Sequence, residues 1–468
     1  MYVRLFLVAI SADFSAENPS PLFNTLIFRE KPKKGLHFPV VYTKMQFVLY
    51  TCLQHLWKNK QENPKEVSEM STSLSVKGMA VKPSSTLAIT AKAKELRAKG
   101  IDVVGFGAGE PDFDTPENIR NSAVEALDRG FTKYTAAAGM PELRKAISKK
   151  FAERNHLEYA PEQIVVSNGG KHALANIFQA ILNPGDEVII PSPCWLSYPE
   201  IVKLADGVPV FVRCSAEQSF KITPEQLANA CNEKTKALIL NSPNNPTGMV
   251  YTKDELKALA KVIVEKDIYV VSDEIYEVLV YDGTEQVSIA SLGEDIYAHT
   301  ITCNGMAKAY AMTGWRIGYT GAPLPVAKVM ASIQSHQTSN PNSIAQYASI
   351  EALNGPQESI LAMRNEFDKR RVYMSGRIAK MPHVSALVPK GAFYVFVNVS
   401  EALSMKHNGE TVGTVANLAK ILIEEYQTAV IPCADFGADD HIRLSYAISM
   451  EQIAKGLDRI EKFLKSLK

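Results

Sequence analysis

The chain has 468 residues, a formal net charge of +1 and a hydrophobic fraction of 46%. This length exceeds what one ordinary hydrophobic core can fill, so we expect two domains. The near-neutral charge argues against a nucleic-acid-binding surface, which usually carries a strong basic excess, but it leaves room for a small pocket that binds acidic molecules.

Residues 1–69 carry no recognisable chemistry. Residues 3–10, VRLFLVAI, resemble the apolar core of a signal peptide only faintly. The stretch 38–57 is apolar but interrupted by polar side chains, so it is a poor membrane span. Residues 58–69 are polar, and we expect them to be unstructured. We interpret residues 1–69 as a dispensable extension, disordered or absent from the mature protein, and expect no membrane partner.

Strand-like and helix-like runs alternate from about residue 120 to residue 320. Apolar residues recur four apart over 171–182, which predicts a helix that ends at Asn183-Pro184-Gly185-Asp186, and a second helix is predicted over 253–265. Strands are predicted at IVVS 164–167, EVII 187–190, VPVFV 208–212, KALILN 236–241, DIYVVSD 267–273 and TITC 300–303. This alternation predicts an α/β fold with a mostly parallel sheet covered by helices on both faces, and ligands beyond the carboxyl ends of its strands.

The C-terminal part of the chain, about 356–468, has a different pattern. It starts with a charged helix over 366–379 and offers two strand candidates, AFYVFVNV at 392–399 and HIRLSY at 441–446. We expect a second, smaller α+β domain here.

Six cysteines are scattered along the chain, and no two of them form a CxxC pair. This spacing suits neither a zinc site nor a dense disulfide framework. Scattered free thiols fit a reducing compartment, so we expect a cytoplasmic protein without a metal site.

The segment TCNGMAKAYAMTGWRIGY places Lys308 after a strand and a turn of small residues, and Arg316 eight residues later. A lysine that is desolvated and close to other cations can be neutral enough to attack an aldehyde. The fork of donors on an arginine can hold a phosphate. The alternative is that both residues are ordinary surface cations.

Asp273 ends an apolar strand in VVSDEIYE, and Tyr276 follows it by one turn. A buried carboxylate needs a partner, and a protonated pyridine nitrogen would serve. It would keep the ring cationic, so that the ring accepts electrons from the α-carbon of a substrate. Tyr276 could donate to the phenolic oxygen of the same ring. For this segment alone, an aspartate that caps a helix is an equally good interpretation.

Two further segments follow predicted strands. In SNGGKHAL, Gly170 opens a helix whose free amides could cradle a phosphate. Lys171 opposes the helix dipole there, and a phosphate or a substrate carboxylate would offset this cost; a solvated surface lysine is the alternative. In PSPCWLSYPE, Trp195 could stack on a flat aromatic cofactor, although tryptophans that merely pack are more frequent.

Asn245 lies in LNSPNNPTGMVY, a rigid turn after a strand, and could bond the same phenolic oxygen. Alone, this segment is better interpreted as a loop. All five segments together supply a Schiff-base lysine, an acid for a ring nitrogen, donors for a phenolic oxygen, a phosphate site and a stacking ring at successive strand ends.

These residues resemble fold-type I, class I aminotransferases, and most of all the bacterial-type aspartate/prephenate aminotransferase branch. The resemblance runs from about Val81 to the C-terminus. The motifs that carry it are AGEPDFDTP 108–116, KYTAAAG 133–139, SPNNPTG 242–248, SDEIYE 272–277, KAYAMTGWRIGY 308–319, GAFYVF 391–396 and RLSYA 443–447. It implies a small domain built from 70–118 and 356–468, and a large domain over 119–355 that binds pyridoxal 5′-phosphate (PLP).

The resemblance also implies a role for each site residue. Lys308 bonds to PLP and shuttles the proton, while Asp273 pairs with the ring nitrogen. The remaining cofactor contacts are Tyr276 and Asn245 on the phenolic oxygen, Trp195 on the ring, and Gly170, the Lys171 backbone and Arg316 on the phosphate. Tyr134 reaches the phosphate of a neighbouring subunit, so a homodimer is implied. Arg443 holds the α-carboxylate of the substrate with the backbone near Gly109; an arginine on an exposed strand face is the alternative.

Two residues bear on the substrate. In the branch that this chain resembles, a lysine at the position of Lys171 pairs with the distal carboxylate of aspartate, glutamate or prephenate. Thr86 matches members that accept prephenate, although it could instead cap a helix. We therefore expect ping-pong transfer of an amino group between dicarboxylic amino acids and 2-oxo acids. An aromatic or alanine aminotransferase, a cysteine-conjugate β-lyase or a catalytically idle PLP-binding regulatory protein are the alternatives.

Three positions depart from the pattern of the family. Cys194 stands where a tyrosine is usual, and Gly305 and Ala307 stand where some relatives carry serines. We expect Cys194 to change the shape of the pocket, and the two small residues to leave more of the phosphate contact to Arg316 and the helix N-terminus.

Overall fold

The computed structural model describes residues 74–83 and 85–468, so the extension predicted over 1–69 lies outside the described residues. In the described range, no helix has both the length and the apolar character that a membrane span needs. Residues Ser75–Lys468 form one unit. Its first elements are α4 (Val76–Met79), α5 (Ser85–Ala98), β1 (Val104–Gly105), α6 (Glu117–Asp128) and α7 (Pro141–Lys150).

The larger sheet of the described chain has seven strands in the order β2-β8-β7-β6-β5-β3-β4. The strands are β2 (Ile164–Ser167), β3 (Glu187–Ser192), β4 (Val208–Arg213), β5 (Thr235–Asn241), β6 (Tyr269–Asp273), β7 (Thr300–Gly305) and β8 (Gly318–Gly321). All pairings are parallel except those of β8, which runs antiparallel between β2 and β7. The mostly parallel sheet is confirmed, whereas β8 was not among the predicted strands.

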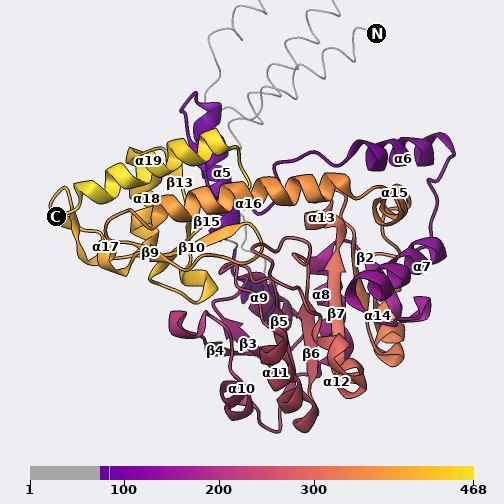
Figure 1. Ribbon diagram of the computed structural model, residues 1–468. Helices are drawn as coiled ribbons and strands as arrows, with labels where there is room; N and C mark the ends of the chain where they lie inside the picture. Colours follow the sequence, from indigo (N-terminus) through magenta and orange to yellow (C-terminus); the bar gives the residue numbers. More distant parts are fainter. Residues whose placement is uncertain (1–73, 84) are drawn as a thin grey trace, which may run out of the picture. The chain divides into compact units, whose positions relative to one another are not determined.

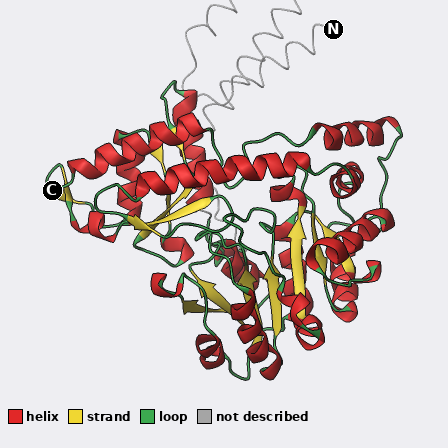
Figure 2. Ribbon diagram, viewed as in Figure 1, coloured by secondary structure: helices red, strands yellow, loops and turns green. Residues whose placement is uncertain are grey.

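Successive strand residues are buried against opposite faces of this sheet, which explains the continuous apolar runs in the sequence. In β5, Ala237 and Ile239 belong to one core cluster, while Leu238 and Leu240 belong to another. Helices therefore cover both faces, as Figures 1 and 2 show. The helices of this part of the chain are α8 (Gly170–Ile181), α9 (Ser197–Leu204), α10 (Pro224–Ala230), α11 (Lys253–Glu265), α12 (Glu294–His299), α13 (Met306–Ala309), α14 (Leu324–Gln337) and α15 (Ser343–Asn354).

A local sequence signal sets the start of α11. Thr252 caps α11: its hydroxyl accepts from the amide of Glu255, and the Glu255 carboxylate accepts from the amide of Thr252 at 2.7 Å. This reciprocal cap explains why α11 begins where the helix over 253–265 was predicted to begin.

The C-terminal part carries a four-stranded sheet in the order β14-β15-β10-β9 and a long helix, α16, that crosses above the larger sheet in Figure 1. Its elements are α16 (Glu358–Ile378), β9 (Ser385–Ala386), β10 (Tyr394–Asn398), α17 (Ser400–Ser404), β11 (Lys406–His407), β12 (Glu410–Thr411), α18 (Val415–Glu425), β13 (Thr428–Ala429), β14 (Ile431–Pro432), β15 (His441–Ser445) and α19 (Met450–Ser466). The predicted helix over 366–379 starts too late, because buried Ile360 and Met363 extend the apolar stripe of α16 toward its N-terminus.

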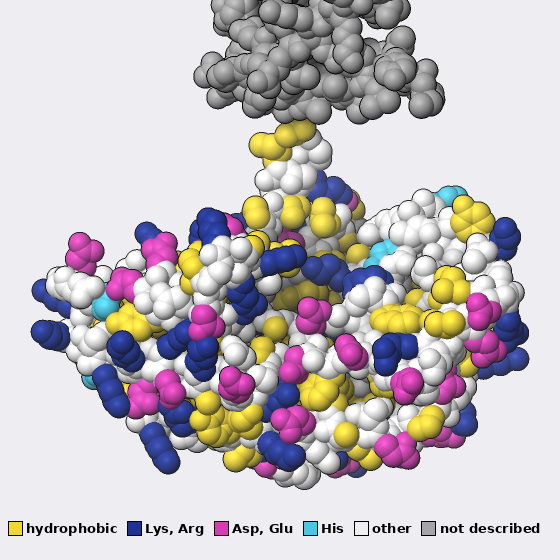
Figure 3. Space-filling view, turned by 90° about the horizontal axis from the view of Figure 1, so that it is seen from above, with side chains coloured by type: hydrophobic (Ala, Val, Ile, Leu, Met, Phe, Trp, Pro, Cys, Tyr) yellow, Lys and Arg dark blue, Asp and Glu magenta, His cyan; other side chains and the backbone are white. Residues whose placement is uncertain are grey.

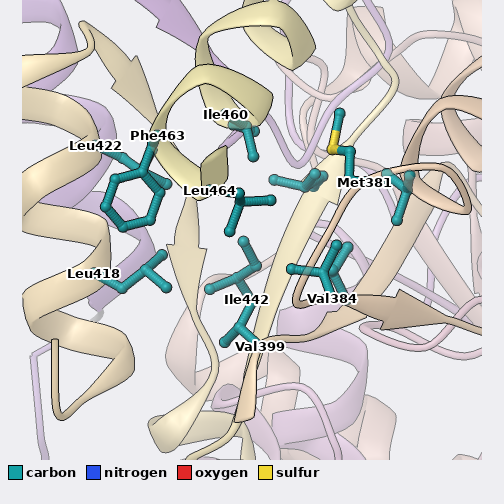
Figure 4. A pocket seen from close by; sticks show the side chains of 12 residues that line it. Met381, Val384, Val399, Leu418, Leu422, Ile442, Ile460, Phe463 and Leu464 are labelled. Carbon is teal, nitrogen blue, oxygen red and sulfur yellow. The ribbon is translucent and has the colours of Figure 1, made fainter. Parts of the chain in front are cut away.

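An N-terminal strand belongs to this part of the fold as well, since β1 pairs in parallel with β13. The core between the small sheet and helices α18 and α19 contains an apolar pocket lined by aliphatic and aromatic side chains, among them Met381, Leu418, Ile442 and Phe463 (Figure 4). On the surface in Figure 3, acidic and basic side chains are interspersed, in keeping with the balanced net charge.

Candidate active site

Five of the predicted site residues lie at one edge of the larger sheet, because parallel strands end on the same side. Gly170 follows β2, Trp195 follows β3, Asn245 follows β5, Asp273 ends β6 and Lys308 follows β7. The apolar pocket of Figure 4 is a different place, and its lining offers no polar group for chemistry.

The amine of Lys308 is half-buried and donates a hydrogen bond to the backbone carbonyl of Gly109. Its nitrogen lies 5.9 Å from the ring centroid of Tyr276 and 5.7 Å from that of Phe393. Burial lowers the pKa of Lys308 to about 8, against the opposing effect of Glu110. A sizeable fraction of this amine is therefore neutral near physiological pH, so the alternative of an ordinary surface lysine fails.

Asp273 is buried, with 5% of its surface exposed, and forms no ion pair with any described residue. Its carboxylate accepts from the hydroxyl of Tyr198 at 2.7 Å and from the amide of Ile275 at 3.2 Å. Burial raises the pKa of Asp273, while these hydrogen bonds and Lys308 oppose that rise. A turn, not a helix, follows Asp273, so the helix-cap alternative is wrong. None of the described residues forms an ion pair with this carboxylate.

The hydroxyl of Tyr276 forms a hydrogen bond with a second buried tyrosine. It lies 2.9 Å from the hydroxyl of Tyr394, the first residue of β10. Both phenols are buried, and burial raises the pKa of each.

Arg443 on β15 is buried, with 2% of its surface exposed, so the exposed-strand alternative is wrong. Its guanidinium donates to Oδ1 of Asn245 at 2.9 Å and to the carbonyl of Gly107 at 3.3 Å, and it lies 4.3 Å from the ring centroid of Tyr394. Its Nε has no hydrogen-bond partner within the described part of the chain. A buried cation without a carboxylate calls for an anionic ligand.

The N-terminus of α8 has free backbone amides and glycines that allow other groups to come close. Gly169 has φ +88° and no side chain caps the helix, so amides of the first turn remain available. A Cβ on Gly169 would lie 2.4 Å from Nη2 of Arg316, and one on Gly318 would lie 2.4 Å from the backbone of Gly169 and Gly170. The structure thus brings Arg316 to the helix N-terminus, in a geometry that can bind a phosphate.

Lys171 lies beside this place, with its ammonium 5.0 Å from the ring centroid of Trp195. Although the residue is exposed, partial burial of its amine and the nearby charge of Arg316 lower its pKa. Trp195 is half-buried and contacts Tyr198 edge to face at 5.3 Å.

Thr86 is the second residue of α5, and its buried hydroxyl oxygen has no hydrogen-bond partner among the described residues. Its helix-cap alternative therefore finds no support. Tyr134 stays apart from the other predicted residues: its side chain is 88% exposed and bonds to none of the described residues.

Gly305 and Cys194, two of the three departures, have different surroundings. A side chain at Gly305 would meet the carbonyl of Ile317 at 2.9 Å and Cα of Gly318 at 3.1 Å, so no serine fits there without backbone movement. Cys194 is buried next to Trp195, and burial raises the pKa of its thiol to about 12.

Sequence reasoning missed Tyr198 and Tyr394. Tyr198 lies one helical turn after Trp195, which places both side chains on one face of the chain, and this spacing is the signal that could have found it. Tyr394 lies within the GAFYVF motif, but its partner Tyr276 is 118 residues away.

Residues 101–460 match the family model described as aminotransferase class I and II. The chain is 51% identical to an aspartate aminotransferase of Bacillus sp. (strain YM-2) over 82% of this chain and 97% of that protein, and 47% identical to the aspartate/prephenate aminotransferase of Cereibacter sphaeroides over 83% and 97%. Among solved structures, aspartate aminotransferase from Rhizobium meliloti superposes with a TM-score of 0.82 at 40% identity (85% and 100% covered). The Thermus thermophilus aspartate aminotransferase with maleate superposes with a TM-score of 0.79 at 46% identity (84% and 100% covered). The chain therefore belongs to the class I and II aminotransferases and is a transferase of nitrogenous groups.

Proposed function

We propose that this chain is a PLP-dependent aminotransferase for dicarboxylic substrates, which moves an amino group between aspartate or glutamate and 2-oxoglutarate, oxaloacetate or prephenate by a ping-pong mechanism. The observation that carries this proposal is a group of charged side chains around one place that form no ion pair with any described residue. Asp273 and Arg443 are buried there, and Lys171 adds a cation beside Trp195. The relatives named above are aspartate or aspartate/prephenate aminotransferases, and one was solved with maleate, a dicarboxylate.

The residues of the site fit PLP. The unpaired carboxylate of Asp273 suits a protonated ring nitrogen, and Tyr276 and Asn245 supply donors for the phenolic oxygen. Trp195 offers a ring face, while Arg316 and the α8 amides after Gly169 suit the phosphate. When bound, PLP supplies an electrophilic carbon and a ring that accepts the electrons left by removal of the α-proton.

The side chains then act in order. Lys308 would hold the cofactor, and its neutral amine would accept the α-proton of the substrate and give it back during the transfer of the amino group. Asp273 would hold a proton on the ring nitrogen. Arg443 binds the α-carboxylate, with backbone near Gly109, and Lys171 binds the distal carboxylate with Thr86 nearby.

Assembly and location are also proposals. The exposed Tyr134 suits a contact with the phosphate of a second copy in a homodimer. The pairing of β1 with β13 supports a small domain built from residues 70–118 and 356–468, around a large domain over 119–355. Five cysteines of the described range are free thiols, in keeping with a cytoplasmic protein.

A substrate panel tests the proposal. Aspartate, glutamate, alanine and phenylalanine serve as donors, with 2-oxoglutarate, oxaloacetate and prephenate as acceptors. Lys171→Ala should lower kcat/KM for the dicarboxylates by roughly 10- to 100-fold, the effect of a lost charged hydrogen bond, and leave alanine nearly unchanged. Lys149→Ala, which removes an exposed lysine from α7, is the matched control. Equal losses for all donors would refute the role of Lys171, and turnover by Lys308→Ala would refute the mechanism.

A further inference from the structure

Two buried hydroxyl groups from different sheets meet at the site. Tyr276 lies in the turn after β6 and is 4% exposed, and Tyr394 begins β10 and is 1% exposed. Their oxygens are 2.9 Å apart, and either could be the donor. The bond therefore joins the turn that follows Asp273 to the small sheet that carries Arg443.

The protons of this pair can be counted. Burial raises the pKa of both phenols, so both remain protonated. Only one of the two protons can lie between the two oxygens. For the other, no acceptor is found in the described part of the chain. Since a buried donor is normally satisfied, this proton points toward a ligand.

The charge of Arg443 decides which phenol donates. The guanidinium lies 4.3 Å from the ring centroid of Tyr394. Among the described residues, the cation that faces the ring of Tyr276 is the amine of Lys308, which lies farther away at 5.9 Å and is more easily neutralised because burial lowers its pKa. A cation over a phenol draws electron density from the ring and makes its hydroxyl a stronger donor and a weaker acceptor. Tyr394 is thus the donor of the pair, and the proton of Tyr276 is the free one.

We propose that Tyr394 is a positioning residue that donates its hydroxyl proton to Tyr276 and thereby directs the proton of Tyr276 toward the phenolic oxygen of the cofactor. This inference rests on the proposed function. A hydrogen bond received by Tyr276 polarises the one that it donates. Tyr394 therefore stabilises the anionic form of the phenolic oxygen without touching it.

The test is an absorbance titration of the PLP-loaded protein. Loss of an anion-stabilising hydrogen bond raises the pH at which the visible band of the lysine-bound cofactor titrates. For Tyr394→Phe we expect a rise of roughly half a pH unit to one pH unit, and a larger rise for Tyr276→Phe. The double variant should titrate like Tyr276→Phe alone, because Tyr394 acts only through Tyr276.

Tyr446→Phe is the matched control. It removes another buried hydroxyl of the same core, which donates to the carbonyl of Ala392 at 3.1 Å, and Tyr281 continues to donate to that carbonyl. Its titration should follow the wild type. Thermal melts of every variant show whether the fold is kept.

The outcomes separate the two proposals. An unshifted titration in Tyr394→Phe, or additive shifts in the double variant, would overturn the positioning role. A wild-type protein that gains no visible band with PLP would instead overturn the proposed function.

Discussion

Loading of the apoprotein with PLP should depend on pH through the amine of Lys308. Burial lowers its pKa to about 8, compared with 10.5 for an ordinary lysine. Only the neutral amine attacks the aldehyde of PLP. At pH 7 about 9% of an amine with a pKa of 8 is neutral, against about 0.03% for an unperturbed lysine, so the site gains roughly 300-fold in reactive amine.

Because the pKa of Lys308 is lowered, the loading rate should rise with pH only up to about pH 8. Below pH 8 each added pH unit should raise the loading rate about tenfold, because the neutral fraction grows tenfold. Above pH 8 the rate should level off. An unperturbed lysine would instead give a rate that keeps rising to about pH 10.

Stopped-flow measurement of the visible band after PLP addition, from pH 6 to pH 10, gives this profile. Nα-acetyl-lysine in the same buffers corrects for the ionisation of PLP itself, and Lys308→Ala should give no band. A corrected rate that still climbs tenfold per pH unit between pH 8 and pH 10 would refute the argument from burial.

Three substitutions probe the rest of the site. Arg443→Gln removes the buried cation and should lower kcat/KM roughly 100-fold for aspartate and alanine alike; a loss confined to dicarboxylates would contradict its place at the α-carboxylate. Gly169→Ala puts a Cβ 2.4 Å from the Arg316 guanidinium at a residue with φ +88°, and should weaken PLP binding about tenfold in equilibrium dialysis; an unchanged Kd would count against the phosphate cradle. Tyr198→Phe removes a hydrogen bond that lowers the pKa of Asp273. The carboxylate should then be lost at higher pH, and the acid limb of the kcat profile should move up by roughly one pH unit; an unmoved limb would exclude this role for Tyr198.

The larger sheet could be predicted because its strands are buried on both faces and read as apolar runs between turn residues. The exception, β8, has the sequence GYTG, whose two glycines carry no strand signal. A larger residue would not fit at Gly321, because a Cβ there would lie 2.4 Å from the ring of Tyr159, which is far away in sequence. Such a contact between distant residues leaves no signal in the neighbouring sequence.

The strand-end residues of the site could be predicted for a similar reason. Parallel strands bring their carboxyl ends to one edge, so the position of Asp273 or Lys308 along the chain is enough to place it. The partners Tyr198 and Tyr394 could not be found in this way, because each hydrogen bond joins residues that are 75 and 118 positions apart. The roles taken from family resemblance cover the groups that touch a ligand, and not the groups that orient them.

The buried charges of the site indicate which ligand groups it binds. Outside the site, buried cations have partners: Lys150 lies 2.5 Å from Glu277, and Arg370 lies 2.7 Å from Asp112. Arg443 is equally buried but meets only an amide oxygen, a carbonyl and aromatic rings among the described residues. An uncompensated buried charge destabilises a fold, and Asp273 adds a second one of opposite sign that is not paired with it. Each charge is best compensated by a different ligand group, a ring nitrogen for Asp273 and a carboxylate for Arg443. Binding of cofactor and substrate should therefore raise the free energy of unfolding that these two buried charges lower.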